Sequence, residues 1–359
     1  MTERDLSRGI HVSELKTFLA CRLQWFWGAM PPIGKGLERK VQPLPFLFGK
    51  AVHAALQAHY DYHVPSSVAF SQVWAEETCA LQTAHQDTHQ LDESLELGQG
   101  MLEGYDLWAE EVADKRVTWL ATETDWQVEV AGCPLAGRYD GVVATSTGLW
   151  VVDFKTTKSG GTGWAWYDLQ PVVYILAARQ MLGPDVRGVQ YRFLRKHLPR
   201  LPLALINQDG RVTTRKDIGR LTTGEYFDRA LKLVAAATAR GIAPADVDLS
   251  TWGQAEEEAY RELAREYYQS RATLKRENAF FWTQEERFSQ DMIDRYLSSL
   301  IVPALQDMQN APIIPSGLGA SFAVCGNCQF QDACRAYLRT GKVLFSAKEF
   351  RRREEYAAL

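Results

Sequence analysis

Residues 137–158 read GRYDGVVATSTGLWVVDFKTTK, two apolar runs separated by a Thr-Ser-Thr-Gly segment. Apolar runs of this length, bounded by threonine, serine and glycine, are typical of a β-hairpin. If residues 145–148 form the loop, with Gly148 where a positive φ is needed, Ala144 pairs with Leu149. This register predicts that Asp140 lies opposite Asp153.

The predicted hairpin brings acidic and basic side chains together. Asp153 and Lys155 are two residues apart and point to the same face of their strand. Opposite residues on paired strands have Cβ atoms about 4.5–5.5 Å apart, so Asp140 and Asp153 can bind one divalent cation. Hard oxygen ligands favour Mg²⁺ or Mn²⁺, and a cation would relieve the repulsion between the two acids. Lys155 can orient a water or stabilise a pentavalent phosphate. The alternative is a charged surface hairpin.

The flanking sequence favours a site. The run VVDF (residues 151–154) is apolar on both faces, which is typical of a buried strand. Gln170 and Tyr174 are four residues apart on the next helix and share a face that can contact Lys155 or a substrate phosphate. Core packing of Gln170 and Tyr174 is the alternative.

Helical periodicity dominates the first part of the chain. Residues 13–29 and about 46–62 each read as one helix, and a mixed helical stretch continues to about residue 115. His53, one turn after Gly49 in the second helix, can offer its imidazole to a metal. A structural histidine is the alternative for this residue.

The period becomes strand-like from Trp119, and the runs ATETDWQVEV, PLAGRYDGVVA and GLWVVDFKT predict a β-meander. Asp168 is placed to cap a helix over 169–182, and VQYRFLR (189–195) predicts a further strand. Residues 214–310 look largely helical, whereas residues 311–359 are rich in loops. The order predicts an α/β fold with a central mixed sheet, flanking helices and helical additions.

Composition limits the class of protein. With 46% hydrophobic and 23% charged residues among 359, the chain is globular rather than disordered. No run reaches the ~18 apolar residues of a membrane span, and acids occupy the N-terminus where a signal peptide is basic. We therefore expect a cytoplasmic protein without membrane contact. The net charge of −4 means that a nucleic acid would be held by a local basic groove.

These motifs, in this order, resemble the RecB-type nucleases of the PD-(D/E)XK superfamily, which include CRISPR-associated and phage exonuclease-like forms and AddB-like nuclease domains. The resemblance covers residues 13–338. Four motifs of the family are matched. They are G-x-x-x-H by Gly49 to His53, G-x-x-D by Gly137 to Asp140, D/E-x-K by Asp153-Phe154-Lys155, and Q-x-x-x-Y by Gln170 to Tyr174. Tyr139 precedes the first acid where the superfamily motif has proline.

The resemblance implies roles for these residues. The expected metal ligands are His53, Asp140, Asp153 and the main-chain carbonyl of Phe154. Lys155 is expected to position the attacking water, with Gln170 and Tyr174 supporting the site and the DNA backbone. Glu123 falls where the family often has a glutamate on the preceding strand, and no role is assigned to it.

Cys325, Cys328 and Cys334 form a C-x2-C-x5-C group. A C-x2-C pair alone indicates redox chemistry or zinc. In the resembling nucleases, three such cysteines and a distant fourth, here Cys21, bind a [4Fe-4S] cluster that would tie the chain ends together. Zinc also takes four thiolates, so it is the alternative occupant.

Two further cysteines, Cys79 and Cys133, stand alone and are expected to be small apolar core residues.

Two segments offer contacts to a nucleic acid. SGGTGWAWYD (159–168) contains Trp164, Trp166 and Tyr167, which can stack on bases, at about 1–3 kcal/mol each, or pack in the core. YRFLRKHLPR (191–200) contains a basic set that can follow phosphates or form a solvated strand end: Arg192, Arg195, Lys196, His197 and Arg200. Neither segment reads base edges, so little sequence specificity is expected. The residues 351–353 read as a plain charged tail.

The sequence thus predicts a metal-dependent DNA nuclease, an exonuclease on single strands or duplex ends, in which a metal-activated water attacks a phosphodiester. It predicts four regions: 1–118 helical, 119–213 nuclease core, 214–310 helical, and 311–359 cysteine cluster and tail. One alternative is a DNA-end-binding subunit that works with a helicase or recombination partner. The other is a zinc-stapled structural protein without catalysis.

Overall fold

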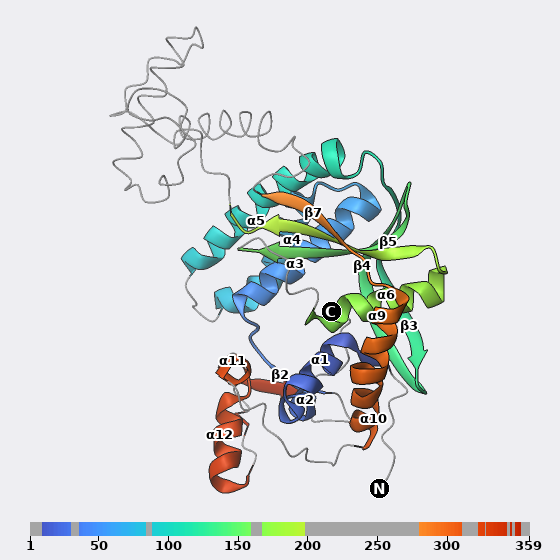
Figure 1. The fold of residues 1–359 in the computed structure, drawn as a ribbon. Coiled ribbons are helices and arrows are strands. Elements are labelled where there is room, and N and C mark those ends of the chain that lie inside the picture. Colours follow the sequence, from blue (N-terminus) through green and yellow to red (C-terminus); the bar gives the residue numbers. More distant parts are fainter. Residues whose placement is uncertain are drawn as a thin grey trace, which may run out of the picture.

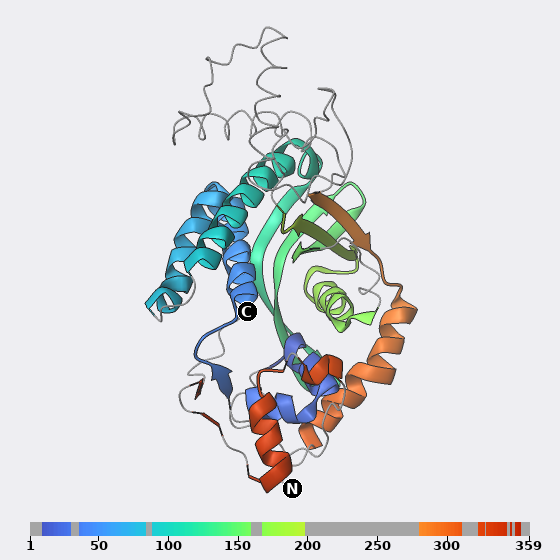
Figure 2. The same cartoon turned by 90° about the vertical axis from the view of Figure 1, so that its left-hand side faces the viewer.

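The computed structural model describes residues 9–29, 36–83, 88–158, 167–197, 280–310, 322–326, 328–342, 345–346 and 349–352. A mixed sheet lies between two layers of helices, as the sequence predicted (Figures 1 and 2). Its strands follow the order β1-β4-β5-β6-β7, and β3 also pairs with β4. Their bounds are β1 (Ile10–His11), β3 (Thr118–Val130), β4 (Cys133–Thr145), β5 (Gly148–Thr157), β6 (Val186–Arg195) and β7 (Phe281–Glu286).

The β4–β5 hairpin has the register that the sequence predicted. Ala144 pairs with Leu149 and Gly141 with Val152. The loop is shorter than expected, because residue 145 also pairs with Gly148. Gly148 has a φ of 126°, and a Cβ on it would lie 2.6 Å from the side chain of a nearby arginine. Glycine is therefore required at this turn.

The strands that pair with β4 change along its length, and Asp140 lies at the point of this change. One edge of β4 pairs with β3 throughout. The other edge pairs in parallel with β1 at Leu135 and Ala136, and in antiparallel fashion with β5 from Gly141 onward. Asp140 is thus the last residue of β4 before the pairing with β5 begins.

Two hydrophobic cores lie on opposite faces of the sheet, because successive strand residues alternate between them. Trp150 and Val152 face the layer formed by α3 (Leu44–Tyr62), α4 (Ser66–Thr83) and α5 (Thr88–Trp108). Val151 faces the second layer. That layer contains α1 (Val12–Ala20), α2 (Arg22–Gly28), α6 (Leu169–Leu182), α9 (Gln290–Tyr296) and α10 (Val302–Asn310). Figure 2 shows the two layers on either side of the strands.

The helix predicted over 13–29 is two helices, so that prediction was wrong in detail. Cys21 is extended, with φ −160° and ψ 107°, and separates α1 from α2. Its sulfur accepts a hydrogen bond from the backbone N–H of Gln24 at 3.5 Å. The cysteine therefore acts as the N-cap of α2, a function that apolar periodicity does not reveal.

The prediction of a largely helical region over 214–310 is wrong for residues 281–286. They form β7, which pairs antiparallel with β6. Trp282 stacks on Phe193 with ring centroids 4.8 Å apart, so packing of aromatic side chains on the sheet decides the conformation. Residues 198–279 lie outside the described residues.

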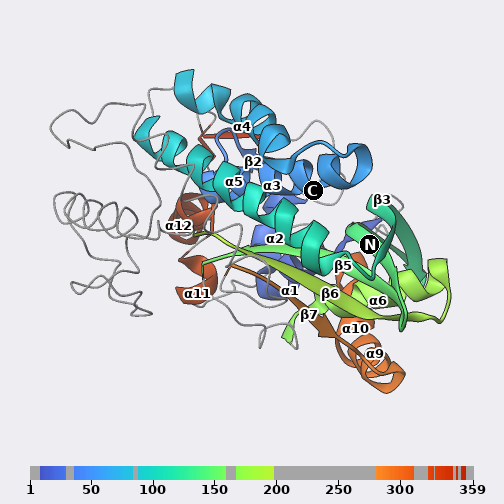
Figure 3. The ribbon, with the colours of Figure 1, turned by 90° about the horizontal axis from the view of Figure 1, so that it is seen from above.

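A segment from the first part of the chain and one from its last part pair in a second, two-stranded sheet. β2 (Leu37–Arg39) pairs antiparallel with β8 (Phe350–Arg352), and Arg351 donates to Glu38 at 2.8 Å. Arg351 and Arg352 therefore belong to a strand rather than to the charged tail that was expected, while Arg353 lies outside the described residues. The helices α11 (Phe322–Cys325) and α12 (Gln331–Thr340) lie beside α2 and β2 (Figures 1 and 3).

Among the described residues, no helix combines the length and apolar character that crossing a membrane requires.

Candidate metal centre and active site

Three acidic residues come from neighbouring positions on three strands. In the β3–β4 register, residue 122 pairs with residue 141 and residue 124 with residue 139, so Glu123 faces Asp140. The β4–β5 register places Asp153 one residue beyond the last recorded pair. Glu123 has a φ of 40°, a left-handed conformation that costs roughly 1–3 kcal/mol in a residue other than glycine. Such strain is found preferentially at functional sites.

A possible ion position is defined by His53, Glu123 and Asp140. One ligand atom from each residue lies within 4.8 Å of the other two, and all three residues are half-buried. Nδ1 of His53 lies 3.3 Å from Oδ1 of Asp140. Two carboxylates and an imidazole suit Mn²⁺ and Mg²⁺, so these residues fit a divalent cation. This is the one such group of His, Cys, Asp and Glu found among the described residues.

Asp153 lies deeper, with 2% of its surface exposed, and two polar side chains contact its carboxylate. Its Oδ2 is 2.7 Å from the Lys155 ammonium. Gln170 donates from Nε2 to Oδ1 of Asp153 at 3.4 Å and to the Tyr174 hydroxyl at 2.9 Å. The shared face predicted for Gln170 and Tyr174 is present, but it contacts Asp153 instead of Lys155.

α6 is fixed at its first turn, which places Gln170. Asp168 accepts the backbone N–H of Gln170 at 2.9 Å, as the predicted cap, and also binds the Lys16 ammonium at 2.7 Å. An acidic N-cap that also forms an ion pair stabilises the helix start. The first turn of α6, and with it Gln170, is therefore fixed by the helix cap and by the ion pair of that cap with α1.

Burial and mutual charge move the pKa values of the acids in different directions. Burial raises the pKa of Asp153 to about 6, although the Lys155 ammonium opposes the shift. Burial and the charge of Asp140 raise the pKa of Glu123 to about 7. Burial also acts against ionised Asp140, but the charge and hydrogen bond of His53 outweigh it and lower the pKa of Asp140. Such a separation is common at catalytic sites.

The basic partners are held in their charged forms. Burial lowers the pKa of His53, but the charge and hydrogen bond of Asp140 more than offset it, and the pKa rises to about 9. Burial similarly opposes ionised Lys155, while Asp153 and Asp140 raise its pKa. In the protein without a cation, the protonated imidazole of His53 thus supplies part of the positive charge that balances the carboxylates.

The four predicted cluster cysteines are Cys21, which is buried, and Cys325, Cys328 and Cys334, which are partly buried. Burial raises the pKa of Cys334, and the neighbouring charges of Cys21, Cys328 and Cys325 raise it further, so the four sulfurs lie within interaction range. The sulfur of Cys21 accepts a backbone hydrogen bond as described, and that of Cys328 accepts one from Phe330 at 3.4 Å. Four neighbouring cysteines from distant parts of the chain fit a metal group bound by thiolates.

The two isolated cysteines differ from one another. Cys133 is fully buried, as predicted, but Cys79 is exposed on α4, so its assignment to the core was wrong. Cys79 occupies a position of α4 that faces solvent, which its residue type alone does not reveal.

The predicted basic set is divided by the structure. Arg192 is buried with 0% exposure, so its assignment to a phosphate-binding surface was wrong. Arg195, Lys196 and His197 lie where β6 ends next to β5, and the Lys196 N–H donates to the carbonyl of Thr157 at 2.7 Å. Arg200 lies outside the described residues.

The predicted aromatic set is represented by one described residue. Tyr167 is 89% exposed directly before the cap of α6, which rules out core packing for it. Trp164 and Trp166 lie outside the described residues.

The sequence did not predict the polar surroundings of Glu123. Arg138 forms two hydrogen bonds to Asp125, at 2.7 and 3.1 Å, and its guanidinium lies 3.6 Å from Glu123. The available signal in the sequence was a pair of residues on each of two neighbouring strands. Arg138 and Asp140 are two apart on one strand, and Glu123 and Asp125 are two apart on the strand before it.

A family model for the PD-(D/E)XK nuclease superfamily matches residues 10–335. The chain belongs to this superfamily. Two solved structures are similar in part. A candidate exonuclease from Eubacterium rectale is 12% identical, with 66% of this chain and 83% of that chain covered and a TM-score of 0.36. The protein SSO0001 is 13% identical, with 69% and 82% covered and a TM-score of 0.20. The comparison with curated proteins found no match.

Proposed function

We propose that this member of the PD-(D/E)XK superfamily is a metal-dependent DNA nuclease of the RecB type, acting as an exonuclease on single strands or duplex ends. The observation that carries the proposal is the convergence of acidic, basic and imidazole groups where β4 meets β5. Glu123, Asp140 and His53 form one group there, and Asp153 and Lys155 the next.

His53, Asp140, Asp153 and the main-chain carbonyl of Phe154 would hold Mg²⁺ or Mn²⁺, and Glu123 is placed to add a third carboxylate. A bound cation supplies a water of lowered pKa and neutralises charge on the phosphate. The protein's own groups do the rest. Asp153 holds the Lys155 ammonium at 2.7 Å, in position to orient the attacking water.

Gln170 and Tyr174 are proposed to support the site rather than to react. The amide of Gln170 donates to both Asp153 and Tyr174, so one side chain fixes the carboxylate relative to α6. Supporting hydrogen bonds of this kind orient ligating carboxylates.

For the DNA, we propose contacts to the phosphates from Arg195, Lys196 and His197, with Tyr167 as a stacking surface. The three basic residues lie at the same end of the sheet as Lys155, because β5 and β6 run parallel with residue 157 opposite Arg195. Contacts to phosphates and base faces carry little sequence information.

We propose a [4Fe-4S] cluster for Cys21, Cys325, Cys328 and Cys334, with zinc as the alternative. The electrostatic interactions among the four sulfurs support a shared thiolate site. Both zinc and an iron-sulfur cluster take four thiolates, so metal analysis of the purified protein distinguishes them. The cluster would hold α2 and the C-terminal segments together.

The test is digestion of end-labelled linear and of circular single-stranded DNA with Mg²⁺ or Mn²⁺. We expect the wild-type protein to degrade the linear strand and to spare the circle, and Asp153→Ala and Lys155→Ala to abolish degradation. Asp185→Ala is the matched control, because its carboxylate is 80% exposed at the other end of β5. Unchanged digestion by both site variants would remove the proposed mechanism.

A further inference from the structure

Arg192 is a buried cation with no access to solvent, on the strand next to the catalytic one. It occupies β6 opposite Phe154 of β5, and its side chain is fully buried. A buried guanidinium destabilises a protein unless charged and polar partners surround it. Its surroundings therefore require an explanation in structural or functional terms.

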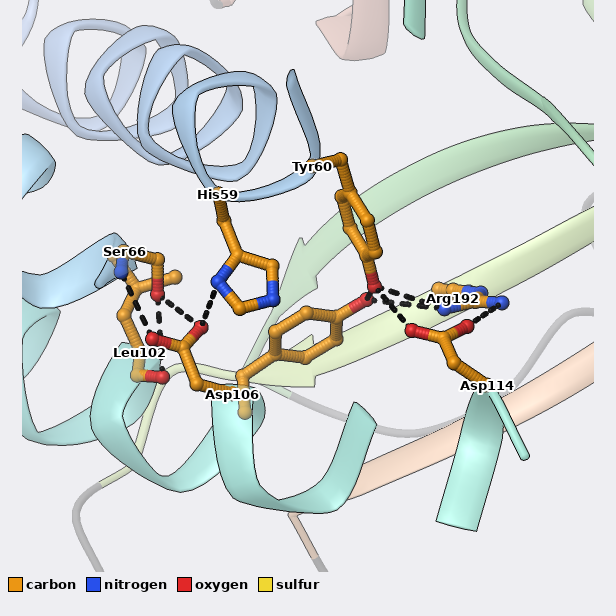
Figure 4. Close-up of polar contacts among 8 residues, drawn as sticks. His59, Tyr60, Ser66, Leu102, Asp106, Asp114 and Arg192 are labelled. Atoms are coloured by element: carbon orange, nitrogen blue, oxygen red, sulfur yellow. Dashed lines mark hydrogen bonds and ion pairs between the residues drawn. The ribbon is translucent and has the colours of Figure 1, made fainter. Parts of the chain in front are cut away.

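The partners of Arg192 come from distant parts of the chain, and Figure 4 shows Tyr60 and Asp114 beside its guanidinium. Nη2 lies 2.8 Å from Oδ1 of Asp114, and Nη1 donates to the hydroxyls of Tyr60 at 3.0 Å and Tyr105 at 3.4 Å. The Tyr60 hydroxyl also donates to Oδ2 of Asp114 at 3.0 Å. The guanidinium lies over the ring of Trp119, 4.9 Å from its centroid.

Asp114 reaches this cluster because the end of α5 changes its winding. Residues 109–113 form a π-helical turn, and the N–H of Asp114 donates to the carbonyl of Ala109 at 2.8 Å. Such turns are rare and occur frequently at functional sites, although a second one lies at Leu297–Ile301. The turn is a second feature, independent of the buried charge, that marks this cluster.

The cluster holds the aromatic side chains that enclose Phe154. The Tyr60 ring stacks on Trp119 with centroids 3.8 Å apart and lies parallel to Phe154 at 6.1 Å. The ring of Tyr105 meets Phe154 edge-on at 6.1 Å. On its remaining side, Phe154 meets the His53 imidazole edge-on at 6.3 Å.

His53 and Tyr60 both belong to α3 and are seven residues apart, which is close to two full turns. They therefore lie on the same face of the helix, one toward Asp140 and the other toward Arg192. Any shift of Tyr60 along the sheet moves His53 with it.

We propose that the buried Arg192–Asp114 pair acts through Tyr60 to position α3, and so holds His53 where it can bind a divalent cation together with Asp140. Tyr60, Asp114 and Arg192 are positioning residues, since no side-chain hydrogen bond joins them to His53, Glu123, Asp140 or Asp153 in the part of the chain that the structure describes. The inference rests on the proposed metal-dependent function and adds a supporting shell to it.

The experiment compares Tyr60→Phe with Tyr105→Phe. Replacing Arg192 itself would leave Asp114 without its cation and destabilise the fold strongly. Each test variant therefore removes a single tyrosine hydroxyl. Both phenols bind Arg192 and each other, with the two hydroxyls 2.8 Å apart. Tyr105 belongs to α5, however, so its loss leaves α3 attached to Asp114.

The readout is the dissociation constant of Mn²⁺ for the full chain, measured by calorimetry without DNA. We expect Tyr60→Phe to weaken binding about 10-fold, the lower range for loss of a supporting group, and Tyr105→Phe to leave it unchanged. Saturating Mn²⁺ should restore the cleavage rate of Tyr60→Phe to that of the wild type. Both variants should lose comparable thermal stability.

Equal Mn²⁺ affinities in Tyr60→Phe and the wild type, or equal losses of Mn²⁺ affinity in the two tyrosine variants, would show that the cluster only stabilises the fold. These outcomes overturn the inference and leave the nuclease proposal standing. Absence of Mn²⁺ binding in the wild-type protein would overturn both.

Discussion

The backbone N–H of Phe154 donates to Oδ2 of Asp140 at 2.6 Å, so the residue between Asp153 and Lys155 also fixes the carboxylate of the neighbouring strand. A D-x-K segment on β5 therefore contributes more than its two charged side chains. Its main chain orients the first acid, and the Phe154 ring faces the opposite helical layer. The middle position of the motif connects the candidate metal site to the core.

Asp140→Asn should separate ligation from folding. The amide oxygen can still accept the N–H of Phe154, so we expect the variant to fold. Its melting temperature should fall because the charge pair of Asp140 with His53 is lost, although the relieved repulsion of Asp153 and Glu123 offsets part of the loss. Mn²⁺ affinity should fall by more than the about 10–100-fold typical of a supporting residue. Calorimetry and thermal unfolding measure the two effects, and unchanged Mn²⁺ binding would exclude Asp140 as a ligand.

Metal binding should strengthen as pH rises from about 6 to 8. Without a cation, the pKa of His53 is raised to about 9 and that of Glu123 to about 7, so His53 is protonated throughout this range and Glu123 over its lower part. A cation binds their deprotonated forms, and each proton that it displaces makes affinity increase with pH. Titration of Mn²⁺ at several pH values in two buffers of different ionisation enthalpy measures the released protons. Glu123→Gln should flatten the dependence near pH 7, and a pH-independent affinity would contradict the ligand assignment.

The hairpin register and the helix cap at Asp168 could be predicted because each follows from local chemistry: a turn that needs glycine, strand parity and a side-chain oxygen before a helix. The burial of Arg192 could not be predicted, because its partner Asp114 arrives through a π-helical turn 78 residues earlier in the chain. β7 depended in the same way on packing against β6. Glu123 was noticed in the sequence, but its proximity to His53 follows from how α3 lies on the sheet.

Gly49 offers a test of where the substrate approaches. It lies one turn before His53 on α3, and a Cβ at this position would meet nothing within 4 Å. Gly49→Ala should therefore stabilise the helix by roughly 0.5–1 kcal/mol. Gly49→Leu fills the open space, so we expect it to raise the KM for DNA while leaving Mn²⁺ affinity unchanged.

If DNA occupies the space beside Gly49, Gly49→Ala increases stability, whereas Gly49→Leu raises the KM for DNA. Urea unfolding reports the gain in stability, and initial cleavage rates over a range of DNA concentrations report KM. Wild-type cleavage kinetics in Gly49→Leu would mean that the substrate does not pass this part of α3.

Cys328→Ala should lower stability and remove the colour of the protein, whereas Cys79→Ala should do neither. Cys328 lies near the three other cysteines of the group, and its sulfur accepts the N–H of Phe330, whose ring packs against Trp27 at 5.5 Å. Loss of one thiolate would release the link between α2 and the C-terminal segments. Cys79 is exposed on α4 and serves as the matched control.

Anaerobic purification, absorbance near 400 nm, iron and zinc analysis and thermal unfolding measure the effects of Cys328→Ala and Cys79→Ala. A wild-type protein that contains zinc and is colourless would replace the iron assignment, and a colourless Cys328→Ala protein with unchanged stability would show that the cysteine site does not hold the chain ends together.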